Sequence, residues 1–159
     1  TPRHDGQLYR VSPWVLVWEN GNYYLIAYTE GRLKHYRVDK MQSVHQLPGT
    51  AREGAAEYAN FDVNTYMQQM FGMFNGPCKH VTLLCENRFA GAMIDRFGTV
   101  PILVPCPDGE HFKISVDIQV SPQFFGWVAG FGAGVSVSGP PEVRAEMKKT
   151  LDRIQEIYR

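Results

Sequence analysis

Short runs of hydrophobic and β-branched residues, separated by turn residues, dominate the first part of the chain. Residues 8–18, 22–28 and 34–38 are rich in aromatic and β-branched side chains, which favour strands. Asn20-Gly21 between the first two runs is typical of a type I′ turn, and a Glu-Gly pair supplies the next turn. Three short strands joined by tight turns predict a small β-barrel.

A different pattern follows the first 46 residues. Residues 46–60 are punctuated by proline, glycine and alanine with poor helical periodicity, which predicts a linker. A short helix capped by Asp62 comes next. From residue 79 to 138 the hydrophobic pattern predicts the order strand, helix, strand, strand, helix, strand, with the second strand over 99–104. This order is the split βαβ arrangement called ferredoxin-like.

The chain closes with a predicted helix that begins at Pro140-Pro141. Its apolar side chains recur at three- and four-residue spacing, which predicts one packed face and a solvated charged face. The predicted packed face consists of Val143, Met147, Leu151, Ile154 and Tyr158. The preceding helix, around residues 123–131, is apolar on nearly all sides, so we expect Trp127 to be a structural residue.

Charge and cysteine content argue against several classes of protein. Sixteen basic and sixteen acidic residues balance, so any binding of a polyanion needs a local cluster of cations. The three cysteines, Cys78, Cys85 and Cys106, include no CxxC pair, which argues against a disulfide framework and a zinc ribbon. With no signal peptide and no apolar run long enough to span a membrane, we expect a cytoplasmic protein.

Motifs that carry catalysis were not found. There is no Walker sequence and no HExxH, and the five histidines are scattered. The glycines at 130–134 do not fit the dinucleotide fingerprint and follow a helix rather than a strand. We therefore expect no enzymatic activity, no metal and no cofactor.

One segment combines aromatic side chains with cations. The tyrosines at 23–24 lie on a predicted strand next to the basic strand 34–40, which carries Arg37. Bases stack on aromatic rings, and arginine binds phosphate through two hydrogen bonds, so these groups suit a nucleotide or a short single strand. Alternatively, the tyrosines pack the barrel, and Arg37 pairs with a carboxylate such as Asp39 or Glu19. The residues alone leave both interpretations open.

In order and spacing, residues 11–14, 22–28 and 35–41 resemble the WYL domain of bacterial transcriptional regulators. The Trp-Tyr-Leu signature aligns with Tyr23-Tyr24-Leu25, with tyrosine at the first position. Residues 125–132 and the closing helix resemble the C-terminal extension that follows WYL domains. The resemblance covers essentially the whole chain.

The resemblance implies a mixed α+β chain in three parts. These are an Sm-like β-barrel over residues 1–46, a linker with a short helix over 47–77, and a ferredoxin-like βαββαβ domain with a C-terminal helix over 78–159. The first strand of the family's barrel has no counterpart here. We therefore expect an incomplete barrel, or an edge filled by a second chain, since an exposed strand edge invites pairing.

The resemblance also implies a function. WYL domains usually follow a winged-helix DNA-binding domain and sense nucleic acid or nucleotide-like effectors. We therefore expect the effector-sensing and oligomerisation region of a bacterial regulator, a homodimer that contacts promoter DNA only through a winged helix missing from this chain. By position, ligand binding falls to Tyr24, His35, Arg37 and Lys40, with Ser12 and Arg10 as neighbours. The alternatives are a pure dimerisation module without a ligand and a small-molecule enzyme.

Overall fold

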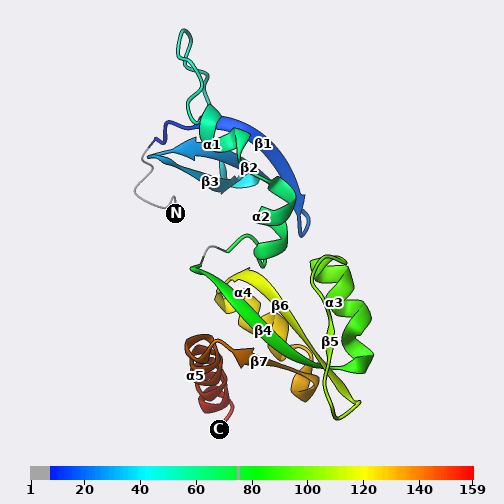
Figure 1. Ribbon diagram of the computed structural model, residues 1–159. Coiled ribbons are helices and arrows are strands. Elements are labelled where there is room, and N and C mark those ends of the chain that lie inside the picture. The colour runs from blue at the N-terminus through cyan, green and yellow to red at the C-terminus, as the bar shows by residue number, and fades with distance from the viewer. Residues whose placement is uncertain (1–7, 75) are drawn as a thin grey trace. The chain divides into compact units, whose positions relative to one another are not determined.

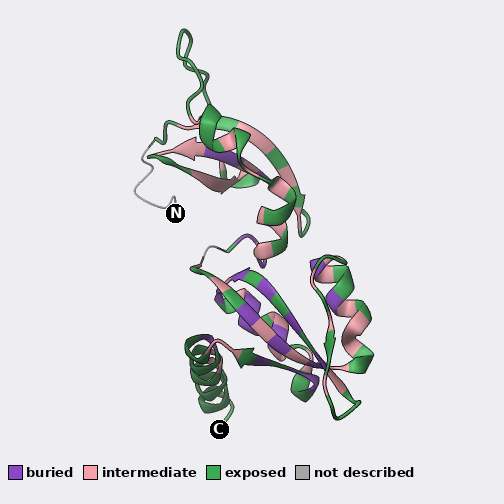
Figure 2. Ribbon diagram, in the orientation of Figure 1, coloured by how far each residue is buried: buried purple, intermediate pink, exposed green. Residues whose placement is uncertain are grey.

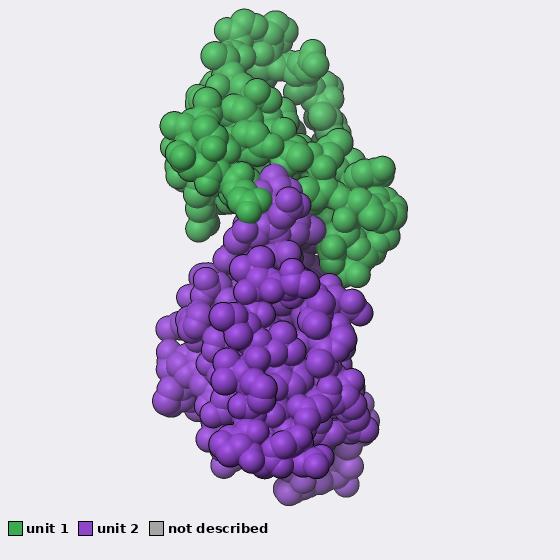
Figure 3. All heavy atoms as spheres, turned by 45° about the vertical axis from the view of Figure 1, so that its right-hand side comes forward, with its two compact units in different colours: residues 1–62 green, residues 63–159 purple. Residues whose placement is uncertain are grey.

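The computed structural model describes residues 8–74 and 76–159, and the chain divides into two compact units, Thr1–Asp62 and Val63–Arg159 (Figure 3). Each unit has its own antiparallel sheet, of three strands in the first unit and four in the second (Figure 1). The chain is therefore a mixed α/β protein with two separate sheets.

The sheet of the first unit has the order β1-β2-β3. Its strands are β1 (Ser12–Glu19), β2 (Asn22–Thr29) and β3 (Arg32–Arg37), followed by the short 3₁₀ helix η2 (Val38–Lys40) and by α1 (Ala55–Ala59). Asn20 and Gly21 join the first two strands with φ angles of 48° and 76°. A type I′ turn needs positive φ at both central residues, so the predicted hairpin is confirmed.

This sheet is open, and the described part of the chain forms no closed barrel. A sheet becomes a barrel only when its first and last strands pair. Here β1 pairs with β2, β2 pairs with β3, and no pairing joins β1 to β3 among the described residues. Residues 1–7, which belong to the predicted barrel segment, lie outside the described residues.

The segment after the sheet folds back onto β1. The backbone N–H of Glu53 donates to Ser12 Oγ at 2.9 Å, and Trp14 Nε1 donates to the backbone oxygen of Glu53 at 3.0 Å. Gly54 then begins the turn into α1 with a φ of 83°. Part of the segment that the sequence predicted as a linker is therefore packed against the first sheet.

The second unit begins with α2 (Val63–Gln69), and its sheet has the strand order β5-β6-β4-β7. Its further elements are β4 (Cys78–Glu86), η3 (Asn87–Phe89), α3 (Ala90–Phe97), β5 (Val104–Pro105), β6 (His111–Gln119), α4 (Pro122–Ala129), η4 (Gly132–Gly134), β7 (Val135–Gly139) and α5 (Pro141–Ile157). The predicted sequence of strands and helices is confirmed. The strand predicted over 99–104 is mostly absent, because only Val104–Pro105 pairs with β6 and Val100 and Ile102 are exposed.

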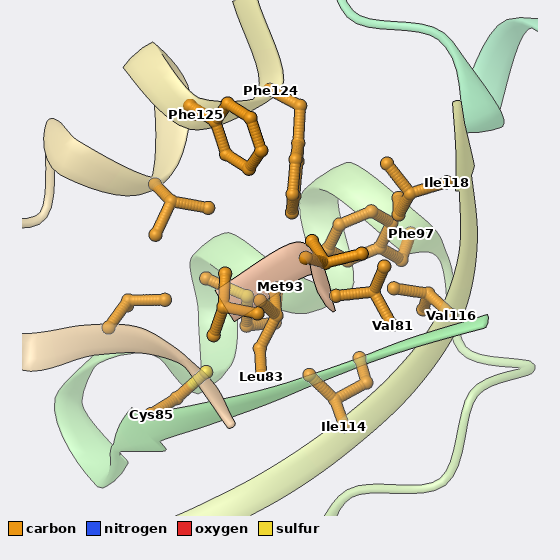
Figure 4. Packing of buried hydrophobic residues seen from close by; sticks show 14 of the residues in the cluster. Val81, Leu83, Cys85, Met93, Phe97, Ile114, Val116, Ile118, Phe124 and Phe125 are labelled. Carbon is orange, nitrogen blue, oxygen red and sulfur yellow. The ribbon is translucent and has the colours of Figure 1, made fainter. Parts of the chain in front are cut away.

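Alternate side chains of β4 and β6 point into one core (Figure 4). Val81, Leu83 and Cys85 of β4 are fully buried, whereas the residues between them are more exposed, so one face of the sheet carries the packing (Figure 2). The helices complete this core with Met93 and Phe97 of α3 and Phe124, Phe125 and Val128 of α4. Burial raises the pKa of the Cys85 thiol to about 11, as expected for an inert core cysteine.

The last helix packs over only part of its length. Val143 is buried and Met147 is partly buried against the core. Leu151, Ile154 and Tyr158 are exposed. The prediction of one packed face along the whole helix is therefore wrong for its C-terminal half. The apolar side chains there lie beyond the core that contacts Val143 and Met147.

Candidate ligand-binding site

Tyr24 and Arg37 are cross-strand partners near the end of the first sheet where Asn20 and Gly21 join β1 to β2. Ile26 pairs with His35 in the same ladder, and side chains two positions apart on a strand share a face. Tyr24, Ile26, His35 and Arg37 therefore lie on one face of β2 and β3. The Tyr24 and His35 rings meet edge to face, with centroids 6.1 Å apart.

Arg37 is held by two partners. Its Nε and Nη2 donate to the two carboxylate oxygens of Asp39, each at 2.8 Å, and Nη2 also donates to Asn22 Oδ1 at 2.7 Å. Asp39 lies in η2, which begins directly after β3, two residues beyond Arg37. Of the two interpretations that the sequence left open, carboxylate pairing of Arg37 is the one seen in this structure.

Asp39 is shared between two cations. Lys40 Nζ lies 3.3 Å from Asp39 Oδ2, on the oxygen that Arg37 Nη2 also contacts. Hydrogen bonding from Arg37, with a further contribution from Lys40, lowers the pKa of Asp39 to about 2. The same contact raises the pKa of Arg37. At neutral pH, two positive charges thus face one negative charge, which leaves a local excess of one positive charge.

Ser12 lies at the other end of the sheet from Tyr24, and Arg10 precedes the sheet. Ser12 pairs with Tyr28, four positions along β2 from Tyr24, a separation of about 13 Å along the strand. Ser12 accepts a hydrogen bond from Glu53, and Arg10 lies 3.7 Å from a Glu53 carboxylate oxygen. The structure therefore brings together Tyr24, His35, Arg37 and Lys40 but not Arg10 and Ser12.

Sequence reasoning missed Asn22 as part of this cluster. Its position at the start of a strand, after the Asn-Gly turn, gave no indication that its side chain would hold a guanidinium. The register explains the contact, because Asn22 precedes Tyr24 by two positions and so shares the face of Arg37. Such a contact depends on the cross-strand register, which a single strand's pattern does not specify.

Two further features of the described residues bear on the site. Among them, no group of three or more His, Cys, Asp or Glu side chains is arranged to hold a metal ion. The helices within residues 8–74 and 76–159 include none that is long and apolar enough to cross a membrane.

Each compact unit contains a stretch that matches a known family model. A WYL-domain family model matches residues 1–46, and a WCX-domain family model matches residues 79–155. Among solved structures, the chain is similar to proteasome accessory factor B/C (PafBC) of Arthrobacter aurescens, with 23% sequence identity and a TM-score of 0.43. That match covers 89% of this chain and 21% of the PafBC chain, so this chain spans about a fifth of its length. No curated protein sequence matches.

The two family models leave only residues 47–78 and 156–159 unmatched. The WYL match contains the sheet with Tyr24 and Arg37, and the WCX match contains the four-stranded sheet of the second unit. The chain therefore contains a WYL domain followed by a WCX domain.

Proposed function

We propose that this chain is the effector-sensing region of a cytoplasmic bacterial transcriptional regulator, and that the surface around Arg37 and Lys40 binds a nucleotide or a single-stranded nucleic acid. The observation that carries the proposal is the local charge. Arg37 and Lys40 share one carboxylate, that of Asp39, on a chain whose formal net charge is +0. A polyanion would therefore find a positive site here despite the neutral chain.

The two cations suit a phosphate in different ways. A guanidinium binds phosphate through two parallel hydrogen bonds, whereas an ammonium acts as a point charge. Asn22 holds one Nη of Arg37, which fixes the plane of the guanidinium. Lys40 is 71% exposed and free to reach a ligand from solvent once Asp39 moves aside. Arg37 would orient the phosphate, and Lys40 would add attraction.

The two tyrosines of β2 differ in exposure and lie on opposite faces of the sheet. Tyr24 is only 8% exposed and packs against His35, so we assign it the role of positioning the strand that carries Arg37. Tyr23 and Trp18, partners in the β1–β2 hairpin, are 54% and 60% exposed, and alternation places them on the opposite face of the sheet from Arg37. These two rings therefore offer no stacking surface beside a phosphate bound at Arg37.

We propose, in addition, that the second unit has a ferredoxin-like fold, and that the chain divides at about residues 46 and 78. Support comes from the order β4-α3-β5-β6-α4-β7, from the antiparallel strand order β5-β6-β4-β7, and from the ends of the two family matches. In this account promoter DNA is bound by a winged-helix domain of the regulator, and the present chain supplies regulation rather than catalysis.

Calorimetric titration tests the proposal. Wild-type protein and Arg37→Ala are titrated with nucleoside monophosphates and with a short 5′-phosphorylated oligothymidylate. We expect stoichiometric binding without turnover by the wild type and much weaker binding by the variant, because the bidentate anion contact is lost. Equal affinity in the two proteins would remove the sensing site from this surface.

A second candidate function is favoured by α5. Leu151 and Ile154 of α5 and Tyr158 directly after it are exposed and form an apolar stripe, which is typical of a surface that joins two chains. If the chain serves only as a dimerisation module, light scattering will show a dimer at high micromolar concentration, and no nucleotide will bind. A monomer at that concentration excludes this alternative.

A further inference from the structure

Asp39 is bound by Arg37 in the two-bond manner in which a guanidinium binds phosphate. Its second oxygen also contacts Lys40 Nζ, so one carboxylate engages both cations of the site. We propose that Asp39 is an internal competitor that sets the minimum charge of the ligand: a terminal phosphate monoester displaces it, and an internal phosphodiester does not. This inference rests on the proposed function and names the ligand group that the site selects.

The selection follows from counting charges. A phosphodiester carries one negative charge, so its exchange for the Asp39 carboxylate replaces one charge by another and gains little. A phosphate monoester carries between about 1.5 and 2 negative charges at pH 7 and offers three acceptor oxygens. It can satisfy Arg37 and Lys40 at once with more charge than the carboxylate supplies. Two unit charges 4 Å apart in water interact by about 1 kcal/mol, which corresponds to roughly fivefold in affinity for each added charge.

A ligand phosphate can replace the Asp39 carboxylate at Arg37 without any opening of the fold. The side chains of Arg37 and Asp39 are 39% and 45% exposed, so the carboxylate can turn into solvent without opening the core. Exposed ion pairs of this kind contribute at most about fivefold to an equilibrium constant. Asn22 still holds Arg37 Nη2 when Asp39 leaves, so the guanidinium stays in place for the incoming phosphate.

The experiment measures the affinity of three ligands for three proteins. The ligands are thymidine 5′-monophosphate, a pentathymidylate with a 5′-phosphate and the same strand without it. The proteins are the wild type, Asp39→Asn, and Glu30→Gln as a matched control. Glu30 loses the same charge in the turn before β3, which places it roughly 16 Å or more from Arg37, beyond the screening length of about 8 Å at physiological salt.

We expect wild type to prefer the phosphorylated strand by about fivefold or more. Asp39→Asn should bind the unphosphorylated strand measurably and both strands about two- to fivefold more tightly, with Glu30→Gln like wild type. If the monophosphate binds as well as the phosphorylated strand, the ligand is a nucleotide. If the phosphorylated strand binds and the monophosphate does not, the ligand is the end of a strand. If Asp39→Asn fails to fold, Asp39→Ser takes its place, with folding checked by circular dichroism.

Two results overturn the inference in distinguishable ways. If none of the proteins binds any of the ligands, Asp39→Asn included, the proposed function itself is wrong. If wild type binds them, and Arg37→Ala binds more weakly in the calorimetric titration above, but the 5′-phosphate has no effect or Asp39→Asn gains nothing, only the role of Asp39 is wrong.

Discussion

The indole ring of Trp14 stacks on the phenol ring of Tyr58, with centroids 4.7 Å apart and an interplanar angle of 18°. The guanidinium carbon of Arg52 lies 3.7 Å from the centroid of the same indole. These contacts join β1 to a segment about forty residues further along the chain. The WYL sheet is therefore stabilised on one edge by the residues that follow it.

We expect Trp14→Leu to destabilise the first unit by about 1–2 kcal/mol, because it loses an aromatic pair and a cation–π contact. Trp14→Phe keeps a ring against Tyr58 and serves as the control, with a smaller loss. Hydrogen exchange of the β1 and β2 backbone amides reports on this unit separately from the other. Equal exchange rates in wild type and Trp14→Leu would show that the stack contributes nothing.

Gly54 occupies a position that no other residue fits. Its φ is +83°, and a Cβ added there would lie 2.3 Å from Cγ of Tyr28. Gly49, with φ +71°, has open space around it. Gly49→Ala should therefore cost only the backbone strain of about 1–2 kcal/mol, whereas Gly54→Ala adds a steric clash of about 1–3 kcal/mol. Denaturant unfolding of the two variants compares them, and equal losses would contradict this packing.

Local patterns predicted the hairpins and the order of elements in the second unit, because these depend on residues close in sequence. The strand predicted over 99–104 is mostly absent for a local reason. Pro101 lacks a backbone N–H, and a proline within a run disfavours a paired strand. The β-branched residues around it are exposed instead.

The candidate site was predictable in part. Alternation along β3 placed His35 and Arg37 on one face, as the register shows. The sequence offered Asp39 and Glu19 as carboxylate partners of Arg37, but the pattern of a single strand could not choose between them, and the structure pairs Arg37 with Asp39. Likewise, nothing in the pattern of α5 indicated where its packed face would end, since that depends on the extent of the surface beneath it.

Trp127 is packed within a cluster of aromatic rings of the second unit. Its ring centroid lies 5.1 Å from that of Phe71, 5.5 Å from that of Phe97 and 4.9 Å from that of Phe131. Trp127→Ala should therefore cost about 3 kcal/mol, the lower end for a core aromatic, since the side chain is only partly buried. Affinity for anions should not change. An unaltered melting temperature would show that the ring is not structural.

The acid titration of Asp39 reports directly on its contact with Arg37. Its pKa in the folded state is about 2, below the usual value of roughly 3.9. A lowered pKa means that the pair's contribution to stability is present above about pH 4 and is lost as the pH falls towards 2. NMR titration of the Asp39 carboxyl carbon should show this low midpoint in wild type and a midpoint near 4 in Arg37→Gln. The same midpoint in both proteins would contradict the pairing.

The most direct test of the account is the salt dependence of the binding of a 5′-phosphorylated pentathymidylate to wild type and Arg37→Ala. Arg37 is half exposed, so the variant remains folded for the comparison. We predict that the variant binds on the order of tenfold more weakly, as expected for the loss of a charged hydrogen-bond partner. Its log–log slope against salt should be shallower by about 0.7, the value for one phosphate contact on a single strand. The same affinity and the same slope in both proteins would contradict an anion-sensing role for the WYL sheet.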